Sequence, residues 1–298
     1  MRRRSLLVAA FATPALARAQ GAAWAPSRPI RLIAPYPPGG GVDTTSRLLA
    51  TPMGAFLGQP VVVENRGGAG GSIGAGELAR SAPDGHTIMV DALAHTVNPH
   101  LIRNPGFDYA SAFAPISQVV VLPQILAVNP QTVPAKTVQD FLAWARPRAG
   151  SLSYGSSGNA TAAHLAAALF LNRARLEITH VPYRGGTPAL QDLLGGSIAF
   201  VFGTVSSTLQ LVRDGRLVAL GVTTVSASSR WRTAASAPAV QRLYEAAKHA
   251  LADAAVRQRL DALGALPLGT DPAAFARYVA DQRALMGRIV REARIEAG

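Results

Sequence analysis

The chain has 298 residues, of which 49% are hydrophobic, so it is long enough for one large domain or two ordinary ones around a real core. It contains no cysteine, which excludes disulfides, zinc–thiolate sites, iron–sulfur clusters and cysteine nucleophiles. Lysine and arginine number 29 against 17 acidic residues, but the arginines are scattered and aromatic residues make up only 6%. We therefore expect a solvated basic surface and no nucleic-acid partner.

The first 19 residues have the three parts of a secretory signal peptide. Arginines at 2–4 form a charged start, an apolar run covers 6–16, and Ala17-Arg18-Ala19 is a small-residue cleavage signal. The apolar run is too short to span a bilayer. We therefore expect an exported protein that is cleaved after about Ala19. The general secretory and twin-arginine routes both stay open.

Predicted strands and helices alternate along the rest of the chain. Short apolar runs predict strands at 30–34, 61–64, 87–90, 114–121, 125–128, 152–154, 178–181, 198–202 and 217–222. Helical periodicity, caps and stops predict helices at 44–57, 73–80, 137–145, 160–171, 187–195, 238–251, 253–263 and 271–293. Strands separated by helices favour an α/β fold with largely parallel sheets. The alternation falls into two series, which suggests two lobes.

Two glycine-rich loops share one design. Residues 36–43 (YPPGGGVD) and 154–161 (YGSSGNAT) each run from the end of a strand into the start of a helix. Free backbone N–H groups and the helix dipole favour an anion there, and the second loop adds hydroxyl donors. Ligands of open α/β sheets lie beyond the carboxyl ends of the strands. The residues alone fit two interpretations about equally well. Either the two loops hold a small carboxylate between them, or they are ordinary strand-to-helix turns.

Motifs for catalysis or metal binding are absent from the sequence. None of the six histidines has the spacing of a metal site, and there is no G-x-S-x-G elbow or Walker motif. We expect no enzymatic activity, no metal and no cofactor. The alternative is a secreted serine hydrolase that uses Ser156 or Ser157 with His164 as its base. His164 lies about two helical turns beyond these serines, which makes direct contact difficult.

The loops resemble those of the tripartite tricarboxylate transporter substrate-binding proteins, the Bug family of periplasmic solute receptors. The matching stretches follow the family's order and lie at 35–40 with Asp43 and Arg47, at 61–66 with 68–71, at 82–87, at 113–116, at 154–159 with 164–166, and at 180–185 with 188–190 and 192–196. The resemblance implies a two-lobed, Venus-flytrap α/β fold with mixed, largely parallel sheets and a hinge. Lobe 1 is expected to comprise 20–112 and 235–298, and lobe 2 to comprise 113–234.

The resemblance also implies a function. A periplasmic receptor of this family would capture a small carboxylate, namely a di- or tricarboxylate, an amino acid or an aromatic acid, for the membrane components of a transporter. Backbone amides, hydroxyls and ordered waters from both lobes would meet the carboxylate. We expect the receptor to be a monomer.

The implied binding residues lie on two loops that we call the jaws. The first jaw comprises Tyr36, Pro38, Gly39, Gly40, Asp43 and Thr44, and the second comprises Ser156, Ser157, Gly158, Asn159, Thr161 and His164. Tyr183 is expected on a neighbouring loop. Asp43 is expected to cap its helix or order a bridging water, because its charge would repel a carboxylate. We interpret His164 and His180 as packed, hydrogen-bonded histidines in preference to ligand contacts. Gly40 is expected at a positive φ, which a β-branched residue would disfavour.

The sequence departs from the family's pattern in two places. Gly203 stands where the family often has an acidic residue that faces the cleft, which leaves ligand selectivity open. The family also has several tens of additional residues between 224 and 237, including a strand that returns to the first lobe. Here 223–238 is short and rich in serine and alanine, which is typical of a linker. A linker would leave a gap or an unpaired edge in the first sheet and weaken closure on the ligand.

Overall fold

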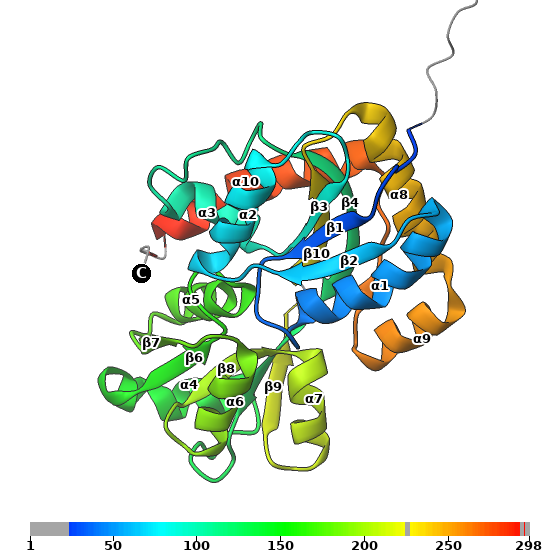
Figure 1. Ribbon diagram of the computed structural model, residues 1–298. Helices are drawn as coiled ribbons and strands as arrows, with labels where there is room; N and C mark the ends of the chain where they lie inside the picture. The colour runs from blue at the N-terminus through cyan, green and yellow to red at the C-terminus, as the bar shows by residue number, and fades with distance from the viewer. Residues whose placement is uncertain (1–23, 224–226, 293–294, 296–298) are drawn as a thin grey trace, which may run out of the picture.

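The computed structural model describes residues 24–223, 227–292 and 295, which form two lobes, each built on one mixed β-sheet (Figure 1). The expected two-lobed α/β fold with mixed sheets is confirmed. The predicted signal peptide lies outside the described residues. Within the described ranges, no helix is both long enough and apolar enough to cross a membrane.

The first lobe contains a six-stranded sheet. In spatial order its strands are β11 (Leu266–Pro267), β4 (Ala114–Leu122), β10 (Ala227–Thr233), β3 (Thr87–Asp91), β1 (Ile30–Ala34) and β2 (Val61–Asn65). β1 pairs parallel with β2 and β3, whereas β10 pairs antiparallel with β3 and β4, and β11 with β4. Its helices are α1 (Gly41–Leu57), α2 (Ser72–Arg80), α3 (Ala94–Leu101), α8 (Ala237–Ala252), α9 (Ala254–Ala262) and α10 (Pro272–Glu292). β3 is buried throughout, which agrees with the three consecutive apolar residues at its centre, 88–90.

The second lobe contains a five-stranded sheet. In spatial order its strands are β7 (Thr179–Pro182), β6 (Ser153–Ser156), β8 (Phe200–Thr204), β5 (Gln124–Val128) and β9 (Val218–Val222). β6 pairs parallel with β7 and β8, and β5 pairs antiparallel with β8 and β9. Its helices are α4 (Val138–Ala145), α5 (Ala162–Ala174), α6 (Gly186–Leu194) and α7 (Val205–Arg213). Neither α3 nor α7 is among the helices that the sequence pattern predicts.

α1 shows how the sequence brings one helix start to the space between the lobes. Its buried residues include Val42, Leu49, Met53 and Leu57, spaced so that they form one face toward the core. The helix ends at Gly58, whose φ of +73° is the left-handed conformation that glycine adopts readily. This apolar face lies in one core cluster with α8, which fixes the direction in which the start of α1 points.

The segment that was expected to be a linker is instead a central strand of the first sheet. β10 lies between β3 and β4 and pairs with both, so the expected gap in the sheet is wrong for this segment. Backbone pairing on two sides outweighs the weak strand propensity of a serine-rich sequence. At its end, the buried Thr233 donates a hydrogen bond from Oγ1 to the backbone oxygen of Thr87 (3.0 Å).

The two sheets divide the chain differently from the expected lobe boundaries. β4 and β10 were both assigned to the second lobe, but they pair within the six-stranded sheet of the first. The chain therefore leaves the first sheet at Pro123, between β4 and β5, and returns to it after β9. A further contact joins the lobes where Leu165 of α5 lies in one buried cluster with Val97 of α3 and Met286 of α10.

Candidate functional site

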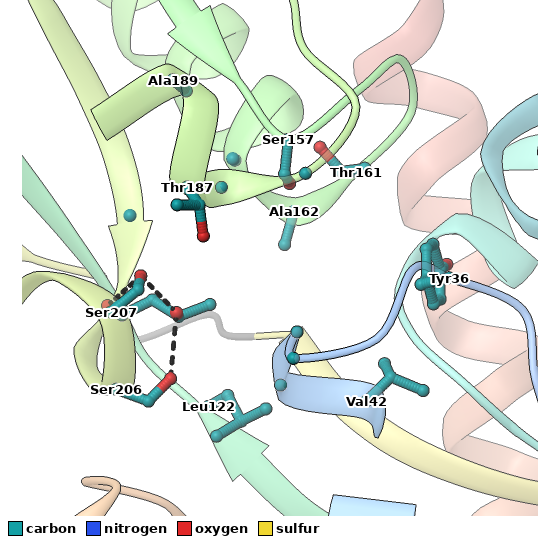
Figure 2. A pocket seen from close by; sticks show the side chains of 18 of the residues that line it. Tyr36, Val42, Leu122, Ser157, Thr161, Ala162, Thr187, Ala189, Ser206 and Ser207 are labelled. Atoms are coloured by element: carbon teal, nitrogen blue, oxygen red, sulfur yellow. Dashed lines mark hydrogen bonds between the residues drawn. The ribbon is translucent and has the colours of Figure 1, made fainter. Parts of the chain in front are cut away.

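A cavity of about 470 Å³ lies between the lobes, and residues of both jaws line it. Of the described helices, four begin at its wall: α1 from the first lobe and α5, α6 and α7 from the second. The start of a helix carries a partial positive charge and backbone N–H groups without a partner in the helix. Figure 2 shows Tyr36 and Val42 of the first lobe across the open space from Thr187 and Ser207 of the second.

The first jaw is held in shape by the buried carboxylate of Asp43. Its Oδ2 accepts a hydrogen bond from the backbone N–H of Gly39 (2.9 Å), and its Oδ1 accepts one from Nδ2 of Asn65 (2.8 Å). Arg47, one turn further along α1, donates from Nε to both oxygens (3.0 and 3.2 Å). Burial raises the pKa of Asp43, but these hydrogen bonds lower it below the ordinary value of an aspartate. Asp43 therefore supports the loop as an ionised group and does not line the cavity.

Glycine has different roles at the two central positions of this jaw. Gly39 has a φ of +83°, in the left-handed region that favours glycine. Gly40 instead has φ −76° and ψ 167°, an extended conformation that any residue adopts. The expected positive φ at Gly40 is therefore wrong, and the strained position is its neighbour. Gly40 lines the cavity, and a Cβ there would meet only the oxygen of Pro37, at 3.7 Å.

Tyr36 is fixed by a buried polar chain behind the cavity wall. Its hydroxyl donates to Oδ1 of Asp91 (3.0 Å), and the other carboxylate oxygen of Asp91 lies 3.0 Å from Nδ1 of His95. Asp91 and His95 are 1% and 0% exposed. The Asn65 side chain also donates to the backbone oxygen of Tyr36 (3.1 Å). Tyr36 therefore forms a rigid part of the wall.

Two stacked histidines support the second jaw. Oγ of the buried Ser156 lies 2.7 Å from Nε2 of His180. The ring of His180 stacks on the ring of His164, with 3.9 Å between centroids and 12° between planes. His164 in turn accepts a hydrogen bond at Nδ1 from the backbone N–H of Ala160 (3.2 Å). Thr161 caps α5, since its Oγ1 accepts from the backbone N–H of His164 (3.4 Å).

Burial keeps both histidines neutral. It lowers the pKa of His164 to about 4, with a smaller contribution from the charge of His180, and it lowers the pKa of His180 to about 4. The interpretation of both as packed, hydrogen-bonded side chains agrees with this geometry.

The geometry does not form the hydrolase site considered above. The histidine that contacts Ser156 is His180, not His164, and no described carboxylate bonds to either ring. Ser156 is 1% exposed and its Oγ also bonds to the backbone N–H and oxygen of Gly158, at 3.2 and 3.0 Å. Its hydroxyl therefore serves the loop. Among the described residues, no group of three or more metal-ligating side chains could hold an ion.

The predicted site residues separate into two groups. Those that line the cavity are Tyr36, Pro38, Gly39, Gly40, Thr44, Ser156, Ser157, Thr161 and Gly203. Those that lie behind the lining are Asp43, Gly158, Asn159, His164 and Tyr183. Tyr183, for example, donates from its hydroxyl to Oδ2 of Asp192 (2.5 Å), and burial followed by this contact raises its pKa to about 12.

Sequence reasoning missed a second part of the lining, at the starts of α6 and α7. This part comprises Arg184, Gly185, Gly186, Thr187 and Pro188 before and within α6, and Thr204, Ser206 and Ser207 at α7. The first of these stretches was identified as a helix start, but its strand-to-helix position was not used to place it at the cleft. The second was missed because α7 itself was not predicted.

Comparison with known proteins identifies the family. A family model described as the tripartite tricarboxylate transporter family receptor matches residues 45–241. A protein of Pseudomonas sp. (strain P51), described as a UPF0065 protein in the tcbD-tcbE intergenic region, is 39% identical over 225 residues, which is 75% of this chain and 67% of that one. Protein BugT of Bordetella pertussis is 36% identical over 214 residues, which is 71% of this chain and 65% of that one.

Solved structures agree in fold over nearly their whole length. The periplasmic binding protein BugD is 28% identical with a TM-score of 0.83, over 91% of this chain and 99% of that one. MatC (Rpa3494) from Rhodopseudomonas palustris, solved with bound malate, is 26% identical with a TM-score of 0.81, over 89% of this chain and 99% of that one. R. palustris Rpa4515, solved with adipate, is 28% identical with a TM-score of 0.84, over 91% of this chain and 99% of that one. The chain therefore belongs to the tripartite tricarboxylate transporter receptor family, the Bug family of periplasmic solute-binding receptors, which are not enzymes.

Proposed function

We propose that this chain captures a small carboxylate in the cavity between its lobes and delivers it to the membrane components of a tripartite tricarboxylate transporter. In this proposal the chain is exported, cleaved after about Ala19, and acts as a monomer in the periplasm. Two similar structures hold malate and adipate, which supports a carboxylate as the class of ligand here.

One observation carries the proposal: the starts of α1 and α5, one from each lobe, line the same cavity. Gly41 and Val42 open α1, and Ala162 and Ala163 open α5, and all four residues line the cavity. The backbone N–H groups in these first positions have no carbonyl partner within their helix. A carboxylate between them would accept hydrogen bonds from both lobes at once, and so its binding would favour closure.

The structure of the first sheet bears on whether this receptor works. Weak closure was expected because a returning strand was thought to be missing, but β10 occupies a central place in that sheet. The reason to expect weak closure of the lobes therefore no longer applies, and we propose a receptor whose lobes can close on a ligand.

A screen of small carboxylates by thermal shift, followed by calorimetric titration of the best ligand, tests the proposal. A ligand that binds only the folded state must raise the melting temperature, by an amount that grows with the logarithm of its concentration over Kd. The matched amide of each acid serves as the control, because it keeps the carbon skeleton and removes the charge. The proposal is wrong if the folded mature chain responds to no carboxylate, or responds equally to acid and amide.

A further inference from the structure

A buried glutamine lies where the cavity meets the segment that joins the two lobes. Gln124 is the first residue of β5 and directly follows Pro123, at which the chain leaves the first sheet. It lines the cavity, although only 2% of its surface is exposed. A polar side chain buried so deeply has lost its bonds to bulk water, so it must find partners in the protein or in what fills the cavity.

The backbone groups of Gln124 already have partners. The backbone N–H donates to Oγ1 of Thr223 (3.0 Å), and the backbone oxygen accepts from the N–H of Thr223 (2.8 Å). Both groups therefore point toward the residue that follows β9. The side chain is the part of Gln124 that remains for a polar contact with a ligand.

The side-chain amide has a donor with a partner and an acceptor without one. Nε2 donates to the backbone oxygen of Leu122 (3.4 Å). This contact sets the orientation of the amide, because the opposite orientation would place two oxygens against each other. Oε1 accepts no hydrogen bond from a described residue, and it is not enclosed by protein atoms. Because Gln124 lines the cavity, we take this open acceptor to face the cavity.

The neighbours of this acceptor are polar and uncharged. Thr204 of β8 lies opposite Gln124 in the strand register, so the two side chains share one face of the sheet. Oγ1 of Thr204 lies 3.1 Å from Oγ of Ser206 and 2.8 Å from Oγ of Ser207. Figure 2 shows these two serines at the end of the open space away from Tyr36. The hydroxyls thus bond to one another and leave Oε1 of Gln124 to the ligand.

The chemistry of an amide oxygen selects the ligand group that fits it. A carboxylate only accepts hydrogen bonds, so it would be repelled by Oε1. An ammonium group can donate, but a buried ammonium needs a negative partner, and no acidic side chain is among the described residues that line the cavity. A hydroxyl donates to Oε1 without adding charge, and it can accept a hydrogen bond in return.

We propose that Gln124 recognises a hydroxyl group of the ligand, so that the receptor selects hydroxy acids over acids without the hydroxyl. The inference rests on the proposed function, because it assumes that a carboxylate of the same molecule lies between the jaws. A site that pairs with a hydroxyl rejects the analogue that lacks it, since its own polar group is then left buried and unpaired. Gln124 would therefore determine specificity among acids of the same length and charge.

Calorimetric titration of the mature chain with acids that differ by one hydroxyl tests the inference. The probes are butanoic, butanedioic and hexanedioic acids, each with the derivatives that carry a hydroxyl on the second or the third carbon. For the skeleton that binds best, we expect one hydroxy derivative to bind about tenfold more tightly than the parent acid, because the parent leaves Oε1 unpaired. The derivative with an amino group on the same carbon should bind no more tightly than the parent.

Two variants then assign the preference to Gln124. Gln124→Met keeps a long unbranched side chain without the amide, so it should bind the hydroxy acid and its parent within about twofold of each other. Gln118 of β4 is also buried, at 5% exposed, but does not line the cavity. Gln118→Met is therefore the matched control and should keep the preference of about tenfold. Thermal melts verify that both variants fold, and the comparison of acids on the unaltered chain needs neither of them.

The outcomes separate the inference from the proposed function. If the hydroxy acids and their parents bind the unaltered chain equally, hydroxyl recognition is wrong while the carboxylate receptor stands. If the preference persists in Gln124→Met, the assignment to Gln124 is wrong. If the amino derivative binds best, the donor is an ammonium group and the inference is also wrong. If none of the acids binds, the proposed function fails and the inference fails with it.

Discussion

Ser156 and His180 form the contact on which the second jaw rests, with 2.7 Å between Oγ of the serine and Nε2 of the imidazole. Because His180 also stacks on His164, which accepts the backbone N–H of Ala160, the conformation of this jaw depends on two neutral imidazoles. A serine beside a histidine is commonly interpreted as a nucleophile. Here the serine is buried, and the pair instead connects a loop that lines the cavity to the core of the second lobe.

Acid should destabilise the fold through this pair. The pKa of each histidine is about 4 in the folded protein, below the ordinary 6.5, so the unfolded chain binds protons first as the pH falls. The stabilisation is complete above about pH 6.5 and is lost as the pH falls toward 4, by up to roughly 3 kcal/mol for each histidine. Urea denaturation at several pH values between 7 and 5 measures it, a range in which ordinary carboxylates stay ionised. His164→Gln should flatten this dependence, and an unchanged slope would show that the pair does not control it.

The two glycines of the first jaw should respond differently to valine. The backbone at Gly40 is extended and leaves room for a Cβ, so the Gly40→Val variant should fold normally. Its side chain should narrow the cavity and lower the affinity for a carboxylate about tenfold or more. Gly39→Val places a β-branched residue at φ +83°, so it should lower the unfolding free energy by about 1–3 kcal/mol. Thermal melts and titration of both variants measure these effects. A folded Gly40→Val variant with unaltered affinity would remove Gly40 from the binding site.

Alanine substitutions at the two neighbouring serines of the second jaw should have different effects, one on ligand binding and the other on stability. Ser157 lines the cavity, and its hydroxyl has no hydrogen-bond partner among the described residues, so Ser157→Ala should leave the melting temperature unchanged. It should cost about 1.5–3 kcal/mol of binding free energy if the hydroxyl donates to the carboxylate. Ser156→Ala should instead lower stability, because its Oγ bonds to His180 and Gly158. Equal carboxylate affinity for Ser157→Ala and the unaltered chain would mean that this hydroxyl does not touch the ligand.

A substitution in β10 distinguishes a strand from a linker. The backbone of residue 232 pairs with Met89 of β3 on one side and with Pro115 of β4 on the other. Arg232→Pro should therefore disrupt the centre of the first sheet, whereas Arg232→Thr should be tolerated because a β-branched residue suits a strand. We expect the proline variant to lose on the order of 3 kcal/mol of unfolding free energy in urea denaturation. If 223–238 were a flexible linker, both variants would melt like the unaltered chain.

Strong local signals in the sequence predicted the parts of the fold that local interactions dictate. The loop and helix at 36–57 were identifiable because an apolar strand, a glycine loop and a periodic helix follow one another directly. The jaws were named as binding loops only from the family resemblance, because the residues alone fitted ordinary strand-to-helix turns about equally well. On charge alone Asp43 was expected to cap its helix or to order a bridging water, and its bond to the backbone of Gly39 required the structure.

Elements that depend on tertiary contacts were missed. β10 is rich in serine, and what makes it a strand is backbone pairing with β3 and β4, which are remote in sequence. α7 begins with Val205-Ser206-Ser207-Thr208, and serine and threonine favour turns as readily as helices. Its contacts with β5 and β8 provide the stabilisation that local propensity lacks. Since α7 forms one end of the cavity, that part of the lining was also beyond the reach of sequence reasoning.

Amide resonances of isotopically labelled mature chain, followed during titration with the best carboxylate, test the central claim most directly. If a carboxylate lies between the jaws, the largest shifts should come from Gly41 and Val42 in the first lobe together with Ala162 and Ala163 in the second, and they should saturate at one common affinity. Saturable binding with shifts confined to one lobe, or with shifts remote from these helix starts, would contradict a carboxylate held between the two jaws.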